Sequence, residues 1–451
     1  MPKLSGLKWN CAIRALLTGG LILLGTSSSS FAGDFKTDGS LDFTFQGPYY
    51  LETQPTAIPR SEQIFHLSAP LSAKWKKWLK FKFTPEAQWD PSNPSVREKS
   101  YWDVTEGYAQ AQFRPVTLQA GMNVFTWGAT DIANPLDIVS PRRFFDPLNS
   151  PKLGTPSLAL KVDGSPISFE ALYIPVQRKS ILPGEQSRWL PRQMIRNRSV
   201  STDDGPASIL LPDPIVYSYA DDQDIQAALK NNYGARLLGQ FHGLDVSLVA
   251  FDGAAVAPAT DLSLSGSIVS LKPQLVIQAD SGVKITPVYF RHRVYGASVV
   301  YTLGEFILRA EGSYDLPLTS RADLPATTTS GVFEVEKSLS IGKDTITLIG
   351  ELTYSHQDAA ADNFSTSLSR IFDRAIILAV RYSPTEQISL LASLLHDTEF
   401  HGEFAHFEGS YAIRDWVKAT LSADILGGET GTPIGTYADN DRVTAGLTLR
   451  W

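Results

Sequence analysis

Cysteine is almost absent from this chain, and after the N-terminal region no long apolar run occurs. The single cysteine, Cys11, precedes a short apolar stretch, Ala15 to Gly25, whereas a lipoprotein cysteine would follow such a stretch. A mature chain that begins after this region has no disulfide and no thiolate chemistry. The apolar stretch is also shorter than the about 20 residues that a membrane helix needs, so we expect no retained helical anchor.

The N-terminal region has the pattern of an export signal. Three basic residues precede the apolar stretch, and Ser30-Phe31-Ala32 places small residues at the two positions that a signal peptidase inspects. We expect cleavage after Ala32. This gives a signal peptide at 1–32 and one mature domain at 33–451.

An excess of positive charge is also lacking. Without the expected signal peptide the chain has 37 basic and 47 acidic residues, a net charge of −10, which argues against nucleic acid as a partner. No phosphate-binding loop, zinc-protease helix or nucleophile elbow is present. We therefore expect no enzyme, no catalytic residue, no cofactor and no metal.

What the chain does contain is alternation of apolar and polar residues. In Leu79 to Trp89 the even positions, from Lys80 to Gln88, are all polar, and the odd positions carry apolar or aromatic side chains. Period-two alternation is typical of a strand with one face in lipid and the other in water. At about 3.3 Å per residue and a tilt near 40°, ten residues climb roughly 25 Å, the height of the apolar band of a barrel.

Similar segments recur along the whole chain, and we expect 18 strands, with 16 as the alternative count. The expected strands lie near 41–48, 62–73, 79–89, 103–113, 115–125, 156–163, 166–174, 232–242, 244–252, 286–302, 305–315, 331–340, 344–356, 373–383, 386–397, 402–413, 416–427 and 441–451.

The connections between these segments alternate in kind. Tight turns such as Arg114-Pro115 and His242-Gly243 alternate with longer segments, of which 126–155, 175–231 and 253–285 are the longest. Short periplasmic turns and long external loops are the signature of an outer-membrane barrel. We predict an all-β, transmembrane, antiparallel up-and-down barrel in the outer membrane of a Gram-negative bacterium. A soluble sandwich or propeller is the alternative, but no blade-length repeat is visible.

The last segment alternates from Val443 and stops on Trp451. It resembles the C-terminal signal strand of outer-membrane barrels, whose final Phe or Trp is read by the barrel assembly machinery. The resemblance implies that Trp451 is an assembly signal and that the last strand closes against the first.

Charged residues are frequent on the expected inward faces, and a barrel of 16 to 18 strands has room for an aqueous channel. For any single residue, pairing across neighbouring strands is the alternative role. The expected pore-lining residues are Lys80, Lys82, Arg236, Arg291, Arg293, Arg309, Glu311, Glu334, Glu336 and Glu351.

The third long loop, Thr126 to Thr155, has too many apolar residues to lie wholly in water. Folding inward, it would narrow the pore and set opposed charges there, which select solutes by charge. A loop that caps the rim or supports a neighbouring subunit is the alternative. The expected constriction residues are Asp131, Asp137, Arg142, Arg143 and Asp146.

The same loop carries a resemblance. Its Trp127-Gly-Ala-Thr-Asp131 and Asn134-Pro-Leu-Asp137 pieces resemble a large proteobacterial family of porin-like outer-membrane barrels of unknown function. This implies a barrel and its location, and no substrate.

A local excess of positive charge follows this loop. From Arg142 to Arg198 the chain has ten basic and four acidic residues, and such a sector would concentrate anions. Contacts to lipopolysaccharide phosphates are the alternative use. We expect a channel for passive diffusion or uptake of small hydrophilic solutes, with anions as the favoured class. Expected partners are outer-membrane lipids, lipopolysaccharide, the barrel assembly machinery and small solutes.

Two other functions stay open. In the first, the barrel does not conduct and has a structural or adhesive role. In the second, it is a lipid hydrolase. Three histidines, His396, His401 and His406, cluster near one expected turn and could bind a metal or act as a base, but their spacing matches no recognised motif. An exposed polar hairpin tip is the simpler interpretation.

Overall fold

A computed structural model describes residues 35–451 apart from 55–57, 93–98, 191–196, 203–204, 211–214, 273–274, 320, 322–323, 343 and 359–369. The expected signal peptide and its cleavage site lie outside these described residues. No helix in the described part of the chain is long and apolar enough to cross a membrane.

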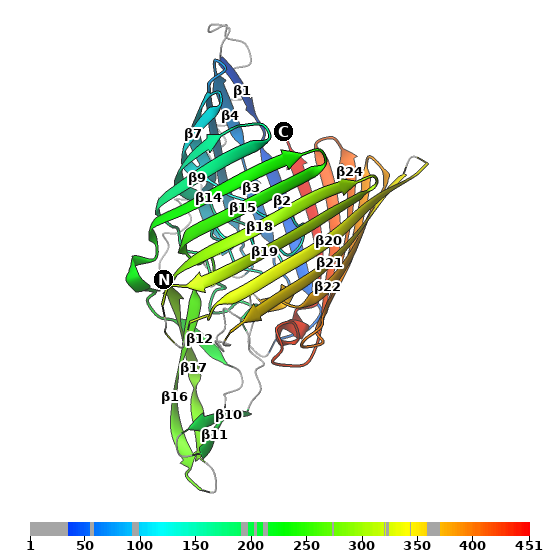
Figure 1. The fold of residues 1–451 in the computed structure, drawn as a ribbon. Coiled ribbons are helices and arrows are strands. Elements are labelled where there is room, and N and C mark those ends of the chain that lie inside the picture. The colour runs from blue at the N-terminus through cyan, green and yellow to red at the C-terminus, as the bar shows by residue number, and fades with distance from the viewer. Residues whose placement is uncertain are drawn as a thin grey trace, which may run out of the picture.

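The chain forms a closed antiparallel barrel of 18 strands (Figure 1). Two barrel strands are interrupted by two residues each, so that β1 and β2 form the first and β3 and β4 the second. The strands of the barrel are β1 (Phe35–Gly39), β2 (Asp42–Tyr50), β3 (Ile64–Ser68), β4 (Leu71–Trp75), β5 (Leu79–Trp89), β6 (Tyr101–Phe113), β7 (Val116–Asn123), β8 (Thr155–Val162), β9 (Ile167–Val176), β14 (Lys230–Phe241), β15 (Leu244–Ala254), β18 (Arg291–Leu303), β19 (Phe306–Pro317), β20 (Thr328–Ile341), β21 (Asp344–Gln357), β22 (Ala375–Thr385), β23 (Ile388–Asp397), β24 (Glu403–Arg414), β25 (Val417–Gly427) and β26 (Arg442–Arg450).

The barrel closes where the sequence predicts it. β26 pairs with β2 along its whole length, and just beyond β26 the backbones of Leu41 and Trp451 exchange hydrogen bonds of 2.9 and 3.0 Å. Closure pairs the two terminal strands, which would otherwise be open edges. The Trp451 side chain points outward and is exposed, as is that of Leu447.

The two faces of the wall differ as the alternation predicts. Outward positions such as Phe81, Leu378 and Leu421 are apolar and exposed, while inward positions such as Glu334 and Ile377 are buried inside the barrel. The predicted count of 18 strands is confirmed, and β5 has the predicted bounds. One predicted strand, 286–302, begins too early, because residues 286–289 belong to another strand and the barrel strand begins at Arg291.

Tight turns join the strands at one end of the barrel, here called the turn end, and longer segments join them at the loop end. At the loop end, parts of the predicted loops 175–231 and 253–285 are strands instead, which form a second sheet of six strands. β17 pairs with β16 in a hairpin and, on its other side, in parallel with three short strands. This sheet extends away from the barrel (Figure 1). Its strands are β10 (Asn197–Thr202), β11 (Gly205–Leu210), β12 (Val216–Tyr219), β13 (Gln223–Asp224), β16 (Ala259–Ser270) and β17 (Leu275–Tyr289).

Three short 3-10 helices complete the described elements, and all lie in loop-end connections. They are η2 (Ile225–Ala227), η3 (Arg370–Phe372) and η4 (Gly435–Asn440).

Candidate functional site

Residues 124–154 connect β7 to β8 and fold into the barrel, and we call them the crossing loop. Five successive backbone N–H groups of this loop point at three glutamates on the inner wall. The bonds run from Thr130 to Glu311 of β19 (2.7 Å), from Asp131 to Glu334 of β20 (2.7 Å) and from Ala133 to Glu351 of β21 (2.9 Å), with further bonds from Ala129 to Glu311 and from Ile132 to Glu351.

These bonds explain why three acidic side chains stand on adjacent strands. Glu311, Glu334 and Glu351 are almost fully buried, and buried carboxylates need hydrogen-bond donors or counter-charges. Arg309 supplies one counter-charge, because it pairs with Glu334 and, at 2.8 Å, with Glu336. The backbone of the crossing loop supplies the other donors. The wall and the loop therefore satisfy each other and fix the loop to this side of the barrel.

The middle of the crossing loop is fixed to a different part of the wall. Arg143 is buried, pairs with Glu86 of β5 at 2.8 Å and with Asp103 of β6, and stacks over the Tyr101 ring at 3.8 Å. A few residues later, Asp146 pairs with Arg442 of β26 at 2.6 Å. β5, β6 and β26 lie several strands away from β19, β20 and β21 around the barrel. The loop therefore crosses the lumen.

Two inward-facing glycines make room for the apolar side chains of the crossing loop. Trp127 and Leu136 are buried in one apolar cluster with residues of the wall. A Cβ added at Gly234 of β14 would overlap the Trp127 ring, and one at Gly296 of β18 would overlap Leu136. The wall therefore lacks side chains at two places where apolar side chains of the loop pack closely against it.

We expect the substitution Gly296→Leu to detach the crossing loop. A side chain at Gly296 meets both Leu136 and the Gly312 carbonyl, and overpacking of this kind costs about 1–3 kcal/mol. Trypsin should then cut after Arg142 or Arg143, which are protected in the native loop. Gly312→Leu is the matched control, because a Cβ there meets only the Ser330 carbonyl at 3.8 Å. Equal trypsin resistance in both variants would argue against close packing of loop and wall.

A cavity of about 890 Å³ lies between the crossing loop and strands β2, β3 and β21 to β26. Most of its charged side chains are paired with one another. Asp424 receives hydrogen bonds from His406 and Arg442, both at 2.6 Å, and Arg442 also pairs with Asp146.

Three charged groups on this cavity have no such partner among the described residues, namely Asp131 of the crossing loop and two groups on the wall. Within the described part of the chain, no hydrogen bond or ion pair is found for the side chains of Arg381 on β22 and Glu408 on β24, which face the cavity across Leu391. These groups are free to meet a solute.

An ion pair from two neighbouring loops borders the same cavity at the loop end. The Lys99 ammonium donates to both carboxylate oxygens of Glu62, at 2.6 and 2.7 Å. Burial alone would lower the pKa of Lys99, but the charge and hydrogen bonds of Glu62 raise it above the usual value. Lys99 therefore keeps its charge at neutral pH, and the pair borders the cavity without being free to bind a solute.

The structure places the predicted constriction residues in different roles. Asp131 and Asp146 line the cavity. Asp137 pairs with Arg142 and with Lys152 inside the crossing loop. Arg143 lies against the wall and is only 2% exposed, so it anchors the loop and does not face the opening. The inward fold of the loop was predicted; the division of its charges between anchoring and lining was not.

Eight of the ten predicted pore-lining residues point inward. Lys80, Lys82, Arg236, Arg309, Glu311, Glu334, Glu336 and Glu351 lie on the inner face, as the exposed apolar side chains of opposite parity on their strands show. Several are paired there; Lys82 binds Glu106, and Arg236 donates to Ser247 at 3.0 Å.

The assignment of Arg291 and Arg293 to the pore was wrong. Both share the parity of Tyr295 and Val299 on β18, whose side chains are exposed on the outer face, and both pair with Asp252 of β15. They lie where β18 begins at the loop end. At the rim of a barrel, charged residues occupy the outer face because the apolar band ends there.

The predicted cationic sector is largely neutralised where it is described. Arg178 pairs with Asp103 at 2.9 Å and Lys179 with Asp222 at 2.5 Å. Arg188 donates to the Glu52 and Asp439 carbonyls and lies over the Tyr50 ring. Arg192 and Arg196 lie outside the described residues.

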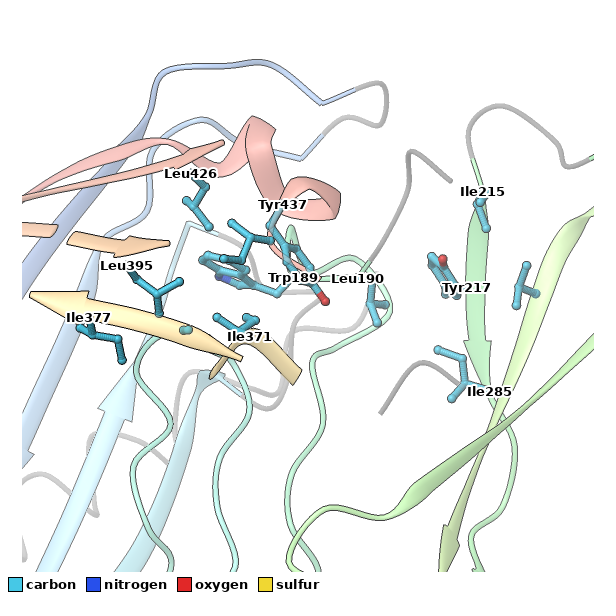
Figure 2. Close-up of a cluster of buried hydrophobic side chains, with 13 residues drawn as sticks. Trp189, Leu190, Ile215, Tyr217, Ile285, Ile371, Ile377, Leu395, Leu426 and Tyr437 are labelled. Atoms are coloured by element: carbon cyan, nitrogen blue, oxygen red, sulfur yellow. The ribbon is translucent and has the colours of Figure 1, made fainter. Parts of the chain in front are cut away.

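Sequence reasoning missed the apolar cluster at the loop end (Figure 2). Trp189 and Tyr437 of η4 lie beside inward residues of the barrel wall, and Leu190 links them to Tyr217 and Ile285 of the second sheet in one buried cluster. The wall residues are Ala375, Ile377, Leu395 and Leu426. Apolar residues at inward positions of β22 and β23 were the available signal, since a water-filled lumen does not need them. This cluster narrows the loop end of the lumen.

The three clustered histidines do not form one site. His396 and His401 lie with ring centroids 6.1 Å apart at the exposed tip, and His396 approaches Glu403 at 3.7 Å. His406 faces the cavity and binds Asp424.

One group of carboxylates has the spacing of a cation site. Asp131, Glu334 and Glu336 bring one oxygen each within 4.8 Å of the others. Arg309 already supplies positive charge to both glutamates, so we assign no metal to this group.

Comparisons with known proteins show the fold. No family model and no curated protein matches the chain. A BenF-like porin from Pseudomonas fluorescens Pf-5 is 9% identical, with 94% of this chain and 99% of that one covered and a TM-score of 0.50. OccK3 (OpdO) from Pseudomonas aeruginosa is 9% identical, with 92% and 95% covered and a TM-score of 0.48. At 9% identity the likeness to the BenF-like porin shows a porin-like barrel fold alone, and the resemblance of the Trp127 and Asn134 motifs to one family stays a prediction.

Proposed function

We propose that the protein is an outer-membrane channel for the passive diffusion or uptake of small hydrophilic solutes, with a preference for anions. One observation carries the proposal. A loop fixed to two different parts of the inner wall crosses the lumen and leaves beside it a cavity of about 890 Å³ that is lined by charged groups. A constriction of this kind selects solutes by size and charge. Such a constriction has no evident use in a barrel that serves only as an anchor.

The proposed location rests on the outer face of the wall. Exposed apolar side chains cover the outward positions, with aromatic residues such as Phe113, Trp416 and Trp451 near the turn end. Such aromatic residues are typical of the membrane interfaces of barrels. We place the turn end in the periplasm and the loop end outside, next to lipopolysaccharide. Trp451 is then available to the assembly machinery after export by the signal peptide.

The proposed anion preference rests on the cations that keep no partner. Arg381 shares its cavity with the unpaired acids Asp131 and Glu408, so the preference rests mainly on the lysines at the turn end, which have no ion-pair partner among the described residues. Unpaired cations raise the local concentration of anions, whereas a cation in an ion pair produces little net electrostatic field.

Reversal potentials across a KCl gradient test this preference. We expect the wild-type channel to be anion-selective, and Arg381→Gln to shift its reversal potential toward cation selectivity. Lys337→Gln is the control, because Lys337 lies on the outer face near Phe306. A cation-selective wild-type channel would overturn the anion preference and leave the channel itself standing.

A second candidate function is a closed barrel with a structural or adhesive role. The apolar cluster of Trp189, Leu190 and Tyr437 favours it, because these side chains fill lumen space at the loop end. Reconstitution in planar bilayers separates the two candidates. Discrete conductance steps support the channel, while a folded barrel that shows none supports the closed form.

A further inference from the structure

A cluster of five lysines lines the barrel at the turn end. Lys36 of β1, Lys74 of β4 and Lys80 of β5 lie on adjacent strands, and Lys76 and Lys77 lie in the turn between β4 and β5. Together with Trp78, Gln110 and Gln112 they line a cavity of about 900 Å³, and none of the described residues in its lining is acidic. We call these residues the lysine cluster.

Three of these lysines face one another directly. Lys36 is the register partner of Lys74, and Lys74 is the register partner of Lys80. Side chains in such positions have Cβ atoms about 4.5–5.5 Å apart, and like charges there destabilise a sheet. The next partner of Lys80 is the neutral Gln110. Lys36, Lys74 and Lys80 therefore form a row across three adjacent strands with three successive positive charges.

No acidic side chain relieves this repulsion in the described part of the chain. Neither an ion pair nor a hydrogen bond of the side chain is found there for Lys36, Lys74, Lys77 or Lys80. The nearest inward acids belong to the next row, where Asp38 is opposite Ser72 and Glu106 is already paired with Lys82. An uncompensated charge of this density lowers its free energy by binding an anion.

Lys36, Lys74 and Lys80 face the lumen, away from lipid, whereas Lys76 in the turn lies over the ring of the outward-facing Trp75. Residues of opposite parity on the same segments, Phe35, Trp75 and Phe113, are aromatic and exposed on the outer face. A lipid headgroup would approach that outer face. The cavity shares Gln110 and Gln112 with a smaller cavity beside it at the same end of the barrel, whose lining includes Lys161, Asp163 and Glu170. The cluster therefore stands where a solute enters or leaves.

We propose that the lysine cluster is a binding site for solutes that carry two or more negative charges, as phosphate or carboxylate groups. Three ammonium groups in a row match charges spread over one solute better than a single halide ion. The binding site stands on this geometry alone, and its use in transport rests on the proposed channel function.

Pyrophosphate is a suitable probe, and its binding to the full-length protein in detergent can be measured by calorimetry without any conduction. The triple variant Lys36→Gln/Lys74→Gln/Lys80→Gln should bind pyrophosphate about tenfold more weakly or worse, since it removes the whole row. The control variant Lys179→Gln/Lys230→Gln/Lys337→Gln removes the same charge from residues outside both cavities and should bind as wild type does. Wild-type affinity in the triple variant would overturn the proposal.

Lys80→Glu separates loss of binding from loss of folding. It places an acid between Lys74 and Gln110, so the repulsion is replaced by an ion pair. We expect weaker pyrophosphate binding together with an unfolding midpoint that is equal to or higher than that of wild type. Undiminished binding in this folded variant would contradict the site.

Vesicle adsorption and conductance separate the solute site from a lipid contact and from the channel function. Loss of adsorption to phosphatidylglycerol vesicles in the triple variant, with pyrophosphate binding unchanged, would show a lipid contact and overturn the solute site. A conducting channel without pyrophosphate binding would overturn this inference alone. A non-conducting barrel that binds pyrophosphate would overturn only the proposed channel.

Discussion

Single-channel conductance should rise about twofold or more when Glu311, Glu334 and Glu351 are replaced together by alanine. The five backbone N–H groups from Ala129 to Ala133 then lose their acceptors. A buried donor without a partner costs about 1–3 kcal/mol, so this arm of the loop leaves the wall and opens the lumen. Planar bilayer recordings should also show more current noise, because a detached loop moves.

Glu305→Ala is the control for this experiment. Glu305 lies in an exposed turn, and Lys337, at 3.8 Å, is its one ion-pair partner among the described residues. The single-channel conductance of the Glu305→Ala variant should equal that of wild type. If the triple alanine variant folds and conducts like wild type, the glutamates do not hold the loop in a narrowing position.

The substitution Arg143→Met should lower the free energy of unfolding by about 3 kcal/mol, as expected when one partner of a buried ion pair is removed. Glu86 and Asp103 then remain on the inner wall, where each is less than one-sixth exposed; Glu86 keeps a contact with His66 at 3.5 Å and Asp103 one with Arg178. Urea unfolding in lipid vesicles measures the change.

Replacing the two carboxylates by neutral amides should restore the stability that Arg143→Met loses. The variant Arg143→Met/Glu86→Gln/Asp103→Asn leaves no unpaired charge and should recover most of the stability. Arg450→Met is the control, since the pair of Arg450 with Asp42 is exposed and such pairs contribute less than about 1 kcal/mol. Equal losses in Arg143→Met and Arg450→Met would show that Arg143 is not an anchor.

The strands were predictable because the barrel wall depends on local alternation. β5 and β26 alternate without interruption, and both were assigned with the correct outward face. β18 was harder, because Arg291 and Arg293 have the parity of lipid-facing residues but lie at the rim. Charge at a strand end does not reveal a face, since both faces are wet there.

The second sheet could not be predicted in the same way. β16 and β17 stabilise each other and three short strands that are distant in sequence. Leucines at 262 and 264 alternate with serines in β16, but alternation over so short a segment is also common in loops.

Within the site, composition predicted what the crossing loop does but not how it is held. Its apolar residues indicated packing, and Trp127 and Leu136 do pack against the wall. Its main attachment uses backbone N–H groups, which every residue has, so no sequence pattern marks them. The lysine cluster had a clear signal, the run from Lys74 to Lys82, but its first part was interpreted only as a turn.

Thiol labelling at Ser393 tests the central claim, that solutes pass through the cavity beside the crossing loop. Ser393 of β23 lines this cavity, and the only cysteine of the chain, Cys11, precedes the expected mature domain. Current through single Ser393→Cys channels is recorded before and after addition of a charged methanethiosulfonate reagent. We predict discrete openings whose current falls in a single irreversible step, while wild-type current is unchanged. Channels that never open, or openings that are unaffected by complete labelling, would contradict the account.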